Sequence, residues 1–307
     1  KPVRMQFGLT NAGIIAQGGV RKMRERDLSN YTKDHSINYA DDFTGYCGFV
    51  DDGKTQVPDW KGLLQSFKEH LEMADKNNMS FKATKTCFGT KTVEFYGRTI
   101  SCDGVCHAPH NLEPLKTMTA PQDLPGLRRV LGVCVQHKDA IENFSFIARP
   151  LHDLTRKGRD WQWRADIENV AYEALRSACL QNKVLAAPDF KKQFFADSDA
   201  SDDGKGHVIF QLKDPELGDT LSNRNIISYF SKAWPDNMRG KPPYYLEADA
   251  LITCVERASY YSRATAYPLV VYCDQAPLQW IKTASKGAVT AWRIERLNGL
   301  DYEVHYK

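Results

Sequence analysis

Two adjacent aspartates, Asp41 and Asp42, lie in the middle of a stretch of apolar and β-prone residues at 36–46. This pattern predicts a β-hairpin whose turn carries the two carboxylates. A hairpin turn holds side chains rigidly and leaves them open to solvent, and Mg²⁺ prefers one or two carboxylates together with water and phosphate oxygens. Acidic pairs are common in polar turns, so the chemistry of this pair depends on the motifs around it.

The overall composition is that of an ordinary globular protein. The chain has 307 residues, of which 42% are hydrophobic and 26% charged, enough for two or three domains with real cores. No apolar run is long enough to cross a bilayer, and eight scattered cysteines favour a reducing compartment. We therefore expect a soluble, intracellular protein. A net charge of +3 permits a nucleic-acid partner without requiring one.

The segment before the hairpin starts with a Phe-Gly turn at 7–8 and continues through Asn11 into an expected helix that reaches about Arg26. This helix would carry a group of basic side chains, namely Arg21, Lys22, Arg24 and Arg26. Two interpretations of the group stay open. It is either a solvated helix face or a surface that lies under a phosphate backbone.

An amphipathic helix is expected after the hairpin, because apolar side chains recur with helical spacing at 60–74. Pro58 and Asp59 precede it, and aspartate is a favourable N-cap residue. Two β-prone runs punctuated by glycine follow, at 81–89 and 93–101, and we predict strands in both.

Taken in order, these segments resemble the C-terminal half of the palm in Ty3/gypsy-type retrotransposon reverse transcriptases. The motifs that carry the resemblance are Phe-Gly-Leu-Thr-Asn-Ala at 7–12, Tyr-Ala-Asp-Asp at 39–42, the helix at 60–74, Lys-Thr-Cys-Phe-Gly at 85–89 and Val-Glu-Phe-Tyr-Gly at 93–97. Each motif is weak alone, but five in this order at plausible spacing are specific.

The resemblance implies roles in DNA polymerisation for several of these residues. Asp41 and Asp42 would be metal-binding carboxylates of the polymerase site, with Mg²⁺ as the cofactor. Four residues would lie against the template and the incoming nucleotide, namely Phe7, Gly8, Asn11 and Gln17. Lys85 would lie near the triphosphate, and Tyr96 and Gly97 would belong to the segment that grips the primer.

The chain becomes rich in β-prone residues after Gln193. Strands are predicted at 194–201, 204–211, 226–230 and 269–273, and a helix is expected at about 246–262. The Ser-Asp-Ala-Ser-Asp run at 198–202 and the Tyr-Cys-Asp run at 272–274 resemble the ribonuclease H domain of the same retrotransposons. That resemblance implies a mixed sheet with flanking helices.

Three carboxylates of this part match the positions of ribonuclease H metal ligands. Asp199 and Asp274 match the first and third, and Asp249 stands where the family has a glutamate on its first helix. Glu247 lies two residues earlier, and residues two apart do not share a helix face, so Asp249 is the predicted ligand. Such carboxylates would hold two Mg²⁺ ions for phosphoryl transfer. The family also has a fourth acidic residue and a last helix further downstream. Together with the shorter reach of aspartate, this leads us to expect weak or absent cleavage of RNA–DNA hybrids.

The resemblance covers nearly the entire chain and implies an α+β or α/β protein in three parts. Residues 1–104 would form part of a palm, 105–190 a helical connection region, and 191–307 the ribonuclease-H-like domain. In this family a further metal-binding aspartate and the fingers precede the first of these motifs, and a last helix follows the ribonuclease H sheet. We therefore expect a C-terminally truncated ribonuclease H domain and a chain that does not polymerise DNA alone.

Two classes of function stay open. The first is a retrotransposon-derived reverse transcriptase and ribonuclease-H-like protein that binds an RNA–DNA hybrid or a primer–template. The second is a domesticated remnant that serves as a structural or nucleic-acid-associated subunit of a larger complex. In both cases we expect protein partners to cover the palm and the end of the ribonuclease H domain, because exposed apolar faces often mark partner surfaces.

Overall fold

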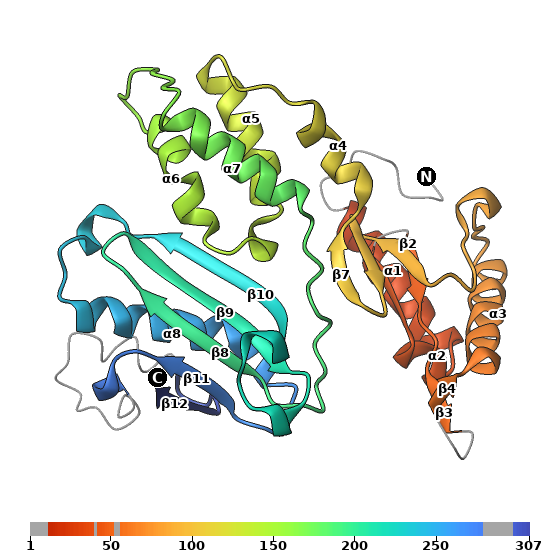
Figure 1. Cartoon of the computed structure of the whole chain (residues 1–307). Coiled ribbons are helices and arrows are strands. Elements are labelled where there is room, and N and C mark those ends of the chain that lie inside the picture. The colour runs from red at the N-terminus through yellow and green to blue at the C-terminus, as the bar shows by residue number, and fades with distance from the viewer. Residues whose placement is uncertain (1–11, 40–41, 52–55, 279–296) are drawn as a thin grey trace. The chain divides into compact units, whose positions relative to one another are not determined.

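The computed structural model describes residues 12–39, 42–51, 56–278 and 297–307 of the chain (Figure 1). It divides into two compact units, Lys1–Ser101 and Cys102–Lys307. Both units combine helices with β-sheet, which confirms the predicted α+β or α/β class. The predicted division into three parts stays a prediction. No helix among the described residues is long and apolar enough to cross a membrane.

The described part of the first unit includes the helices α1 (Ala12–Asp27), α2 (Asn30–Asp34) and α3 (Trp60–Lys76). The predicted amphipathic helix and its cap are confirmed by α3, because the Asp59 side chain accepts a hydrogen bond from the Gly62 N–H at 2.9 Å. Asp27 at the end of α1 accepts hydrogen bonds from Lys76 Nζ at 2.6 Å and from Asn77 Nδ2 at 3.0 Å. These contacts tie the C-terminal ends of α1 and α3 together.

The strands of the first unit form three antiparallel hairpins: β1 (Ser36–Tyr39) with β2 (Asp42–Gly45), β3 (Phe49–Asp51) with β4 (Gln56–Pro58), and β5 (Thr92–Phe95) with β6 (Arg98–Ser101). The first of these confirms the hairpin predicted around the two aspartates, with Tyr39 paired to Asp42. The turn between β5 and β6 consists of Tyr96 and Gly97, whose φ angles are 50° and 69°. Positive φ at both turn residues suits the right-handed twist of the flanking strands.

The strand predicted at 81–89 is wrong. The structure has instead a single 3-10 turn, η1 (Ala83–Lys85). Its hydrogen bonds are local, since the Lys82 carbonyl accepts from the Lys85 N–H at 2.9 Å and from Thr86 Oγ1 at 3.1 Å. Side-chain and backbone bonds of this kind compete with strand pairing.

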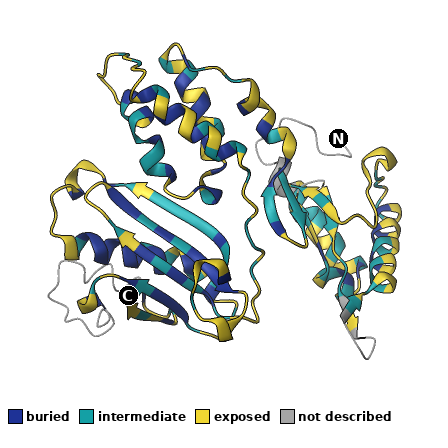
Figure 2. Ribbon diagram, viewed as in Figure 1, coloured by how far each residue is buried: buried dark blue, intermediate teal, exposed yellow. Residues whose placement is uncertain are grey.

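The second unit begins with a strand and a group of helices, namely β7 (Gly104–His107), α4 (Pro109–Thr117), α5 (Leu124–Val135), η2 (Lys138–Ala140), α6 (Phe144–Leu154) and α7 (Glu168–Leu180). The helices α4 to α7 bury the sides that face one another (Figure 2). These sides form one hydrophobic core, which includes Leu127, Leu151 and Leu175. In α7, Leu175 is fully buried while Val170 is 59% exposed. The helix is therefore amphipathic.

Leu175→Ala is expected to lower the free energy of unfolding by about 2–5 kcal/mol, because it opens a cavity in this core. Val170→Ala in the same helix is the matched control and should change it by less than about 0.5 kcal/mol. Urea denaturation followed by circular dichroism measures both. Similar losses in the two variants would contradict the burial assigned to α7.

The remainder of the unit is a five-stranded mixed sheet with strand order β10-β9-β8-β11-β12. Its strands are β8 (Phe195–Ala200), β9 (Gly204–Leu212), β10 (Arg224–Ala233), β11 (Leu269–Cys273) and β12 (Tyr302–Tyr306). The central strand β8 runs antiparallel to β9 and parallel to β11. The strands and the mixed sheet predicted for this part are confirmed. Short 3-10 turns lie between β9 and α8, namely η3 (Pro215–Leu217), η4 (Leu221–Asn223) and η5 (Asp236–Met238).

One long helix, α8 (Pro243–Ser262), packs against one face of this sheet and confirms the helix predicted there. Alternate strand residues such as Ala196 and Val271 meet a stripe of the helix that includes Ala248 and Leu251, and all four side chains are buried. This packing determines which way the other side chains of α8 point.

Candidate metal-binding carboxylate site

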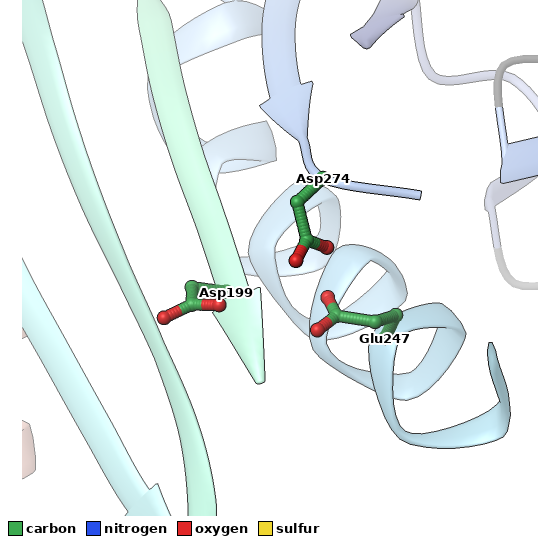
Figure 3. Close-up of side chains that lie close together, drawn as sticks. All are labelled: Asp199, Glu247 and Asp274. Atoms are coloured by element: carbon green, nitrogen blue, oxygen red, sulfur yellow. The ribbon is translucent and has the colours of Figure 1, made fainter. Parts of the chain in front are cut away.

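Three carboxylates, Asp199, Glu247 and Asp274, converge at one end of the sheet (Figure 3). Their ligand oxygens all lie within 4.8 Å of one another. Asp199 is near the end of β8 and Asp274 directly follows β11. Because β8 and β11 are parallel neighbours, their carboxyl ends meet at the same edge. Glu247 reaches this edge from the second turn of α8.

Glu247 is the buried member of the cluster, with 4% of its surface exposed, whereas both aspartates are exposed. Its Oε1 accepts a hydrogen bond from the Ala200 N–H at 3.2 Å. Its Oε2 is buried and receives no hydrogen bond from a described donor. A buried carboxylate oxygen without a donor is costly, and a bound cation would satisfy it.

The electrostatics of the cluster also favour a bound cation. Burial, together with the negative charges of Asp274 and Asp199, raises the pKa of Glu247 to about 7. Burial and the Asp274 charge also raise the pKa of the Asp199 carboxyl. Like charges held this close favour binding of a positive ion, and hard divalent cations prefer oxygen ligands. Among the described residues, this is the one group of three or more acidic, His or Cys side chains with ligand atoms so close together.

The prediction that Asp249 joins the two aspartates is wrong. Its carboxylate instead forms an ion pair with Lys205 on β9, in which Nζ and Oδ2 are 2.5 Å apart and both side chains are only 10% exposed. Glu247 occupies the position expected for Asp249. The physical reason is the rotation of α8, since residues 247 and 249 lie about 100° to either side of the buried Ala248 and so point to opposite flanks.

Sequence reasoning passed over two residues, Glu247 and Lys205. The sequence contained evidence for both residues. Lys205 is a cation on a strand whose other residues are mostly buried, and a buried cation needs an acidic partner. Asp249 is that partner. Once it is assigned to Lys205, Glu247 is the acid on this turn left to face the aspartates.

Several residues assigned to polymerisation lie outside the described residues, namely Phe7, Gly8, Asn11 and Asp41. Asp42 is exposed at the first position of β2, Lys85 is exposed in η1, and Gln17 is half-buried in α1. The structure brings Tyr96 to the hairpin of Asp42, since its ring centroid is 4.2 Å from that of Tyr39. Gly97 lies in the same turn as Tyr96. Their polymerase roles, and the expectation that the chain alone does not polymerise DNA, stay predictions.

A mixed five-stranded sheet with one long helix on its face and a carboxylate cluster at the ends of two parallel strands defines a ribonuclease-H-like domain. The family described as "RNase H-like domain found in reverse transcriptase" matches residues 163–269. Relatives and structures that match nearly the whole chain extend this result. The comparisons confirm the predicted resemblance, because the chain is similar to retrotransposon Pol polyproteins and shares the fold of a viral protease–reverse transcriptase.

Among the relatives are Pol polyproteins of Drosophila melanogaster transposons. The Pol polyprotein of transposon 297 is 25% identical to this chain and matches 99% of the chain's residues. The polyprotein of opus is 26% identical over 90% of the chain, and that of gypsy is 27% identical over 73% of the chain. The chain spans about a quarter of each of them, 26%, 26% and 22% respectively. These similarities do not favour the alternative of a domesticated structural subunit, and the expected protein partners stay a prediction.

Foamy viral protease–reverse transcriptases are among the solved structures that share the fold. A foamy viral protease–reverse transcriptase in complex with double-stranded DNA matches 99% of this chain and 50% of its own, with a TM-score of 0.78 and 17% identity. The foamy viral protease–reverse transcriptase in complex with an RNA/DNA hybrid matches 99% of this chain and 39% of its own, with a TM-score of 0.76 and 17% identity.

Proposed function

We propose that this chain binds Mg²⁺ through Asp199, Glu247 and Asp274 and cleaves the RNA strand of an RNA–DNA hybrid. The observation that carries the proposal is the convergence of three carboxylates at the ends of two parallel strands and the start of α8. The family match over 163–269 and the hybrid bound by a protein of the same fold support it.

The residues present fit a hard divalent cation. Three carboxylates offer oxygen ligands, and a buried Glu247 oxygen receives no hydrogen bond from a described donor. When bound, such ions activate a water and stabilise the charge that develops on a phosphate. The Ala200 N–H holds Glu247 in place, and the rigid ends of β8 and β11 hold the two aspartates.

The phosphate backbone of the hybrid needs positive charge near the carboxylates. Arg239 and Lys241 lie in the short segment that leads into α8, eight and six residues before Glu247, and both are exposed. Lys241 Nζ lies 5.9 Å from the ring centroid of Tyr245, on the same turn as the carboxylate. We assign these two side chains to phosphate contacts that position the hybrid without reading its sequence.

The test is cleavage of a labelled RNA annealed to DNA by the 307-residue chain. We expect cleavage that requires Mg²⁺, that stops with a chelator, and that is at least about 100-fold slower in Asp274→Asn, a larger loss than outer-shell changes cause. Asp160→Asn is the matched control, because this aspartate is exposed and lies outside the cluster.

Two further substrates test whether cleavage is specific for the hybrid. Single-stranded RNA and duplex DNA of the same sequence should stay intact under the same conditions. The expectation of weak or absent cleavage rested in part on an aspartate at the second ligand position, and Glu247 removes that part of the reasoning. Full activity of Asp274→Asn, or no cleavage by the unmodified chain, would overturn the proposal.

A further inference from the structure

Lys205 carries a buried positive charge beside the carboxylate cluster. Its side chain is 10% exposed, and Nζ donates hydrogen bonds to Asp249 Oδ2 and to Thr253 Oγ1, both at 2.5 Å. Nζ also lies 5.3 Å from the centroid of the Trp234 ring. Asp249 and Thr253 are one turn apart on α8, so this one amine on β9 is bonded to two turns of the helix.

A second contact holds the opposite flank of the same helix. Glu247 accepts a hydrogen bond from the backbone N–H of Ala200 on β8. Ala200 and Lys205 are direct partners across the β8–β9 ladder. Residues 247 and 249 lie about 100° to either side of Ala248, which is buried against the sheet. One pair of opposite strand residues, Ala200 and Lys205, therefore contacts α8 on both of its flanks.

This arrangement controls rotation of α8 about its axis. Ala248, the residue beneath this turn, presents one methyl group, so apolar packing alone resists rotation weakly at this point. A buried ion pair is poor at adding stability, since both charges lose their hydration, but it is effective at selecting one arrangement. The Lys205–Asp249 pair selects the rotation that turns Glu247 toward Asp199 and Asp274.

We propose that Lys205 is a positioning residue of the carboxylate site. Through Asp249 it holds α8 in the rotation at which Glu247 completes the cation site, and it thereby sets the affinity for the metal. This inference rests on the proposed function for its metal. Asp249 acts as the anchor of Lys205 and not as a ligand.

The experiment measures Mn²⁺ binding directly, by electron paramagnetic resonance titration, in the 307-residue chain. Lys205→Met should weaken Mn²⁺ binding about 10- to 100-fold, the range seen when a residue that orients a ligand is removed. Because Lys205→Met removes the amine that is bonded to Asp249, Lys205→Met/Asp249→Asn is measured as well, with thermal melting to verify folding. The double variant should show the same weakened binding.

The matched control is Lys232→Met. Lys232 is an exposed lysine on β10, directly paired with Lys205 across the β9–β10 ladder. Its replacement removes one positive charge at the same level of the sheet but touches neither α8 contact. Mn²⁺ affinity should stay within about twofold, which separates positioning from a general change in surface charge.

Asp249→Asn distinguishes an anchor from a ligand. The asparagine oxygen still accepts the Lys205 hydrogen bond, so Mn²⁺ affinity should fall by less than about fivefold, well short of the loss for a removed ligand. A loss from Asp249→Asn as large as that from Glu247→Gln would overturn the proposal, as would unchanged binding in folded Lys205→Met.

Hybrid cleavage provides the second readout. Lys205→Met should lower kcat and leave KM for the hybrid within about twofold, because Lys205 does not face the substrate. If the chain binds Mn²⁺ through Glu247 but does not cleave hybrids, the proposed function fails and the positioning role stands. If it cleaves hybrids and Lys205→Met binds Mn²⁺ normally, the positioning role fails alone.

Discussion

Glu247→Gln is expected to lower both Mn²⁺ affinity and the rate of hybrid cleavage by more than about 100-fold, beyond the cost of losing an outer-shell partner. Glu247 is the buried member of the cluster, and the negative charges around it are what a cation would neutralise. The amide keeps the shape and can still accept the Ala200 N–H, so the loss reports the carboxylate itself. Mn²⁺ titration and single-turnover cleavage measure the two effects.

Glu303→Gln is the matched control for this substitution. Glu303 belongs to β12 of the same sheet, and its side chain is 55% exposed. Its replacement should leave both measurements within about twofold. Glu247→Asp adds a test of reach, since a carboxylate one methylene shorter should recover only part of the affinity. Near-normal Mn²⁺ binding by Glu247→Gln would show that the cluster is not the metal site.

The second large effect concerns acid stability and arises at His207. This residue lies on β9 with 5% of its surface exposed, and its Nε2 receives no hydrogen bond from the described residues. Its ring stacks on Phe230 at 4.5 Å, and the Arg257 guanidinium lies 4.2 Å from the same Phe230 ring. Burial, then the charges of Arg257 and Lys205, lower the pKa of His207 from 6.5 to about 3.

A pKa lowered in the folded state means that folding favours the neutral imidazole. This contribution to stability is fully present above pH 6.5 and is lost as the pH falls toward 3. We expect His207 to cost about 3 kcal/mol of unfolding free energy between pH 6.5 and pH 4. His207→Phe, which keeps an aromatic ring beside Phe230 and cannot be protonated, should remove that loss.

The measurement is the difference in unfolding free energy between the unmodified chain and His207→Phe, from urea denaturation at pH 7.5 and at pH 4. Other groups titrate in this range, and the difference cancels their contributions. His305→Phe, which replaces an exposed histidine of β12, is the control and should leave the pH dependence unchanged. An equal acid loss with and without His207 would contradict its neutral, buried state.

Local sequence patterns predicted those parts of the fold whose stability is local. The cap of α3 needs only an aspartate before a helical stripe, and the β1–β2 hairpin needs only β-prone residues around a polar pair. The run at 81–89 has the same β-prone character, yet it forms a 3-10 turn, because the Lys82 carbonyl is taken by local donors. Composition cannot distinguish a strand with a partner from a segment that satisfies its own hydrogen bonds.

The carboxylate site also contains residues that the sequence identified and one that only the structure identified. The sequence identified Asp199 and Asp274 through its resemblance to the ribonuclease H motifs, and the structure places both at the carboxyl ends of parallel strands that meet at one edge. Only the tertiary structure decided between Glu247 and Asp249. That choice depends on the rotation of α8, which is set by contacts from strands more than forty residues away, above all by Lys205. Because Asp249 is paired with the buried Lys205, Glu247 is the acid of this turn that faces the two aspartates.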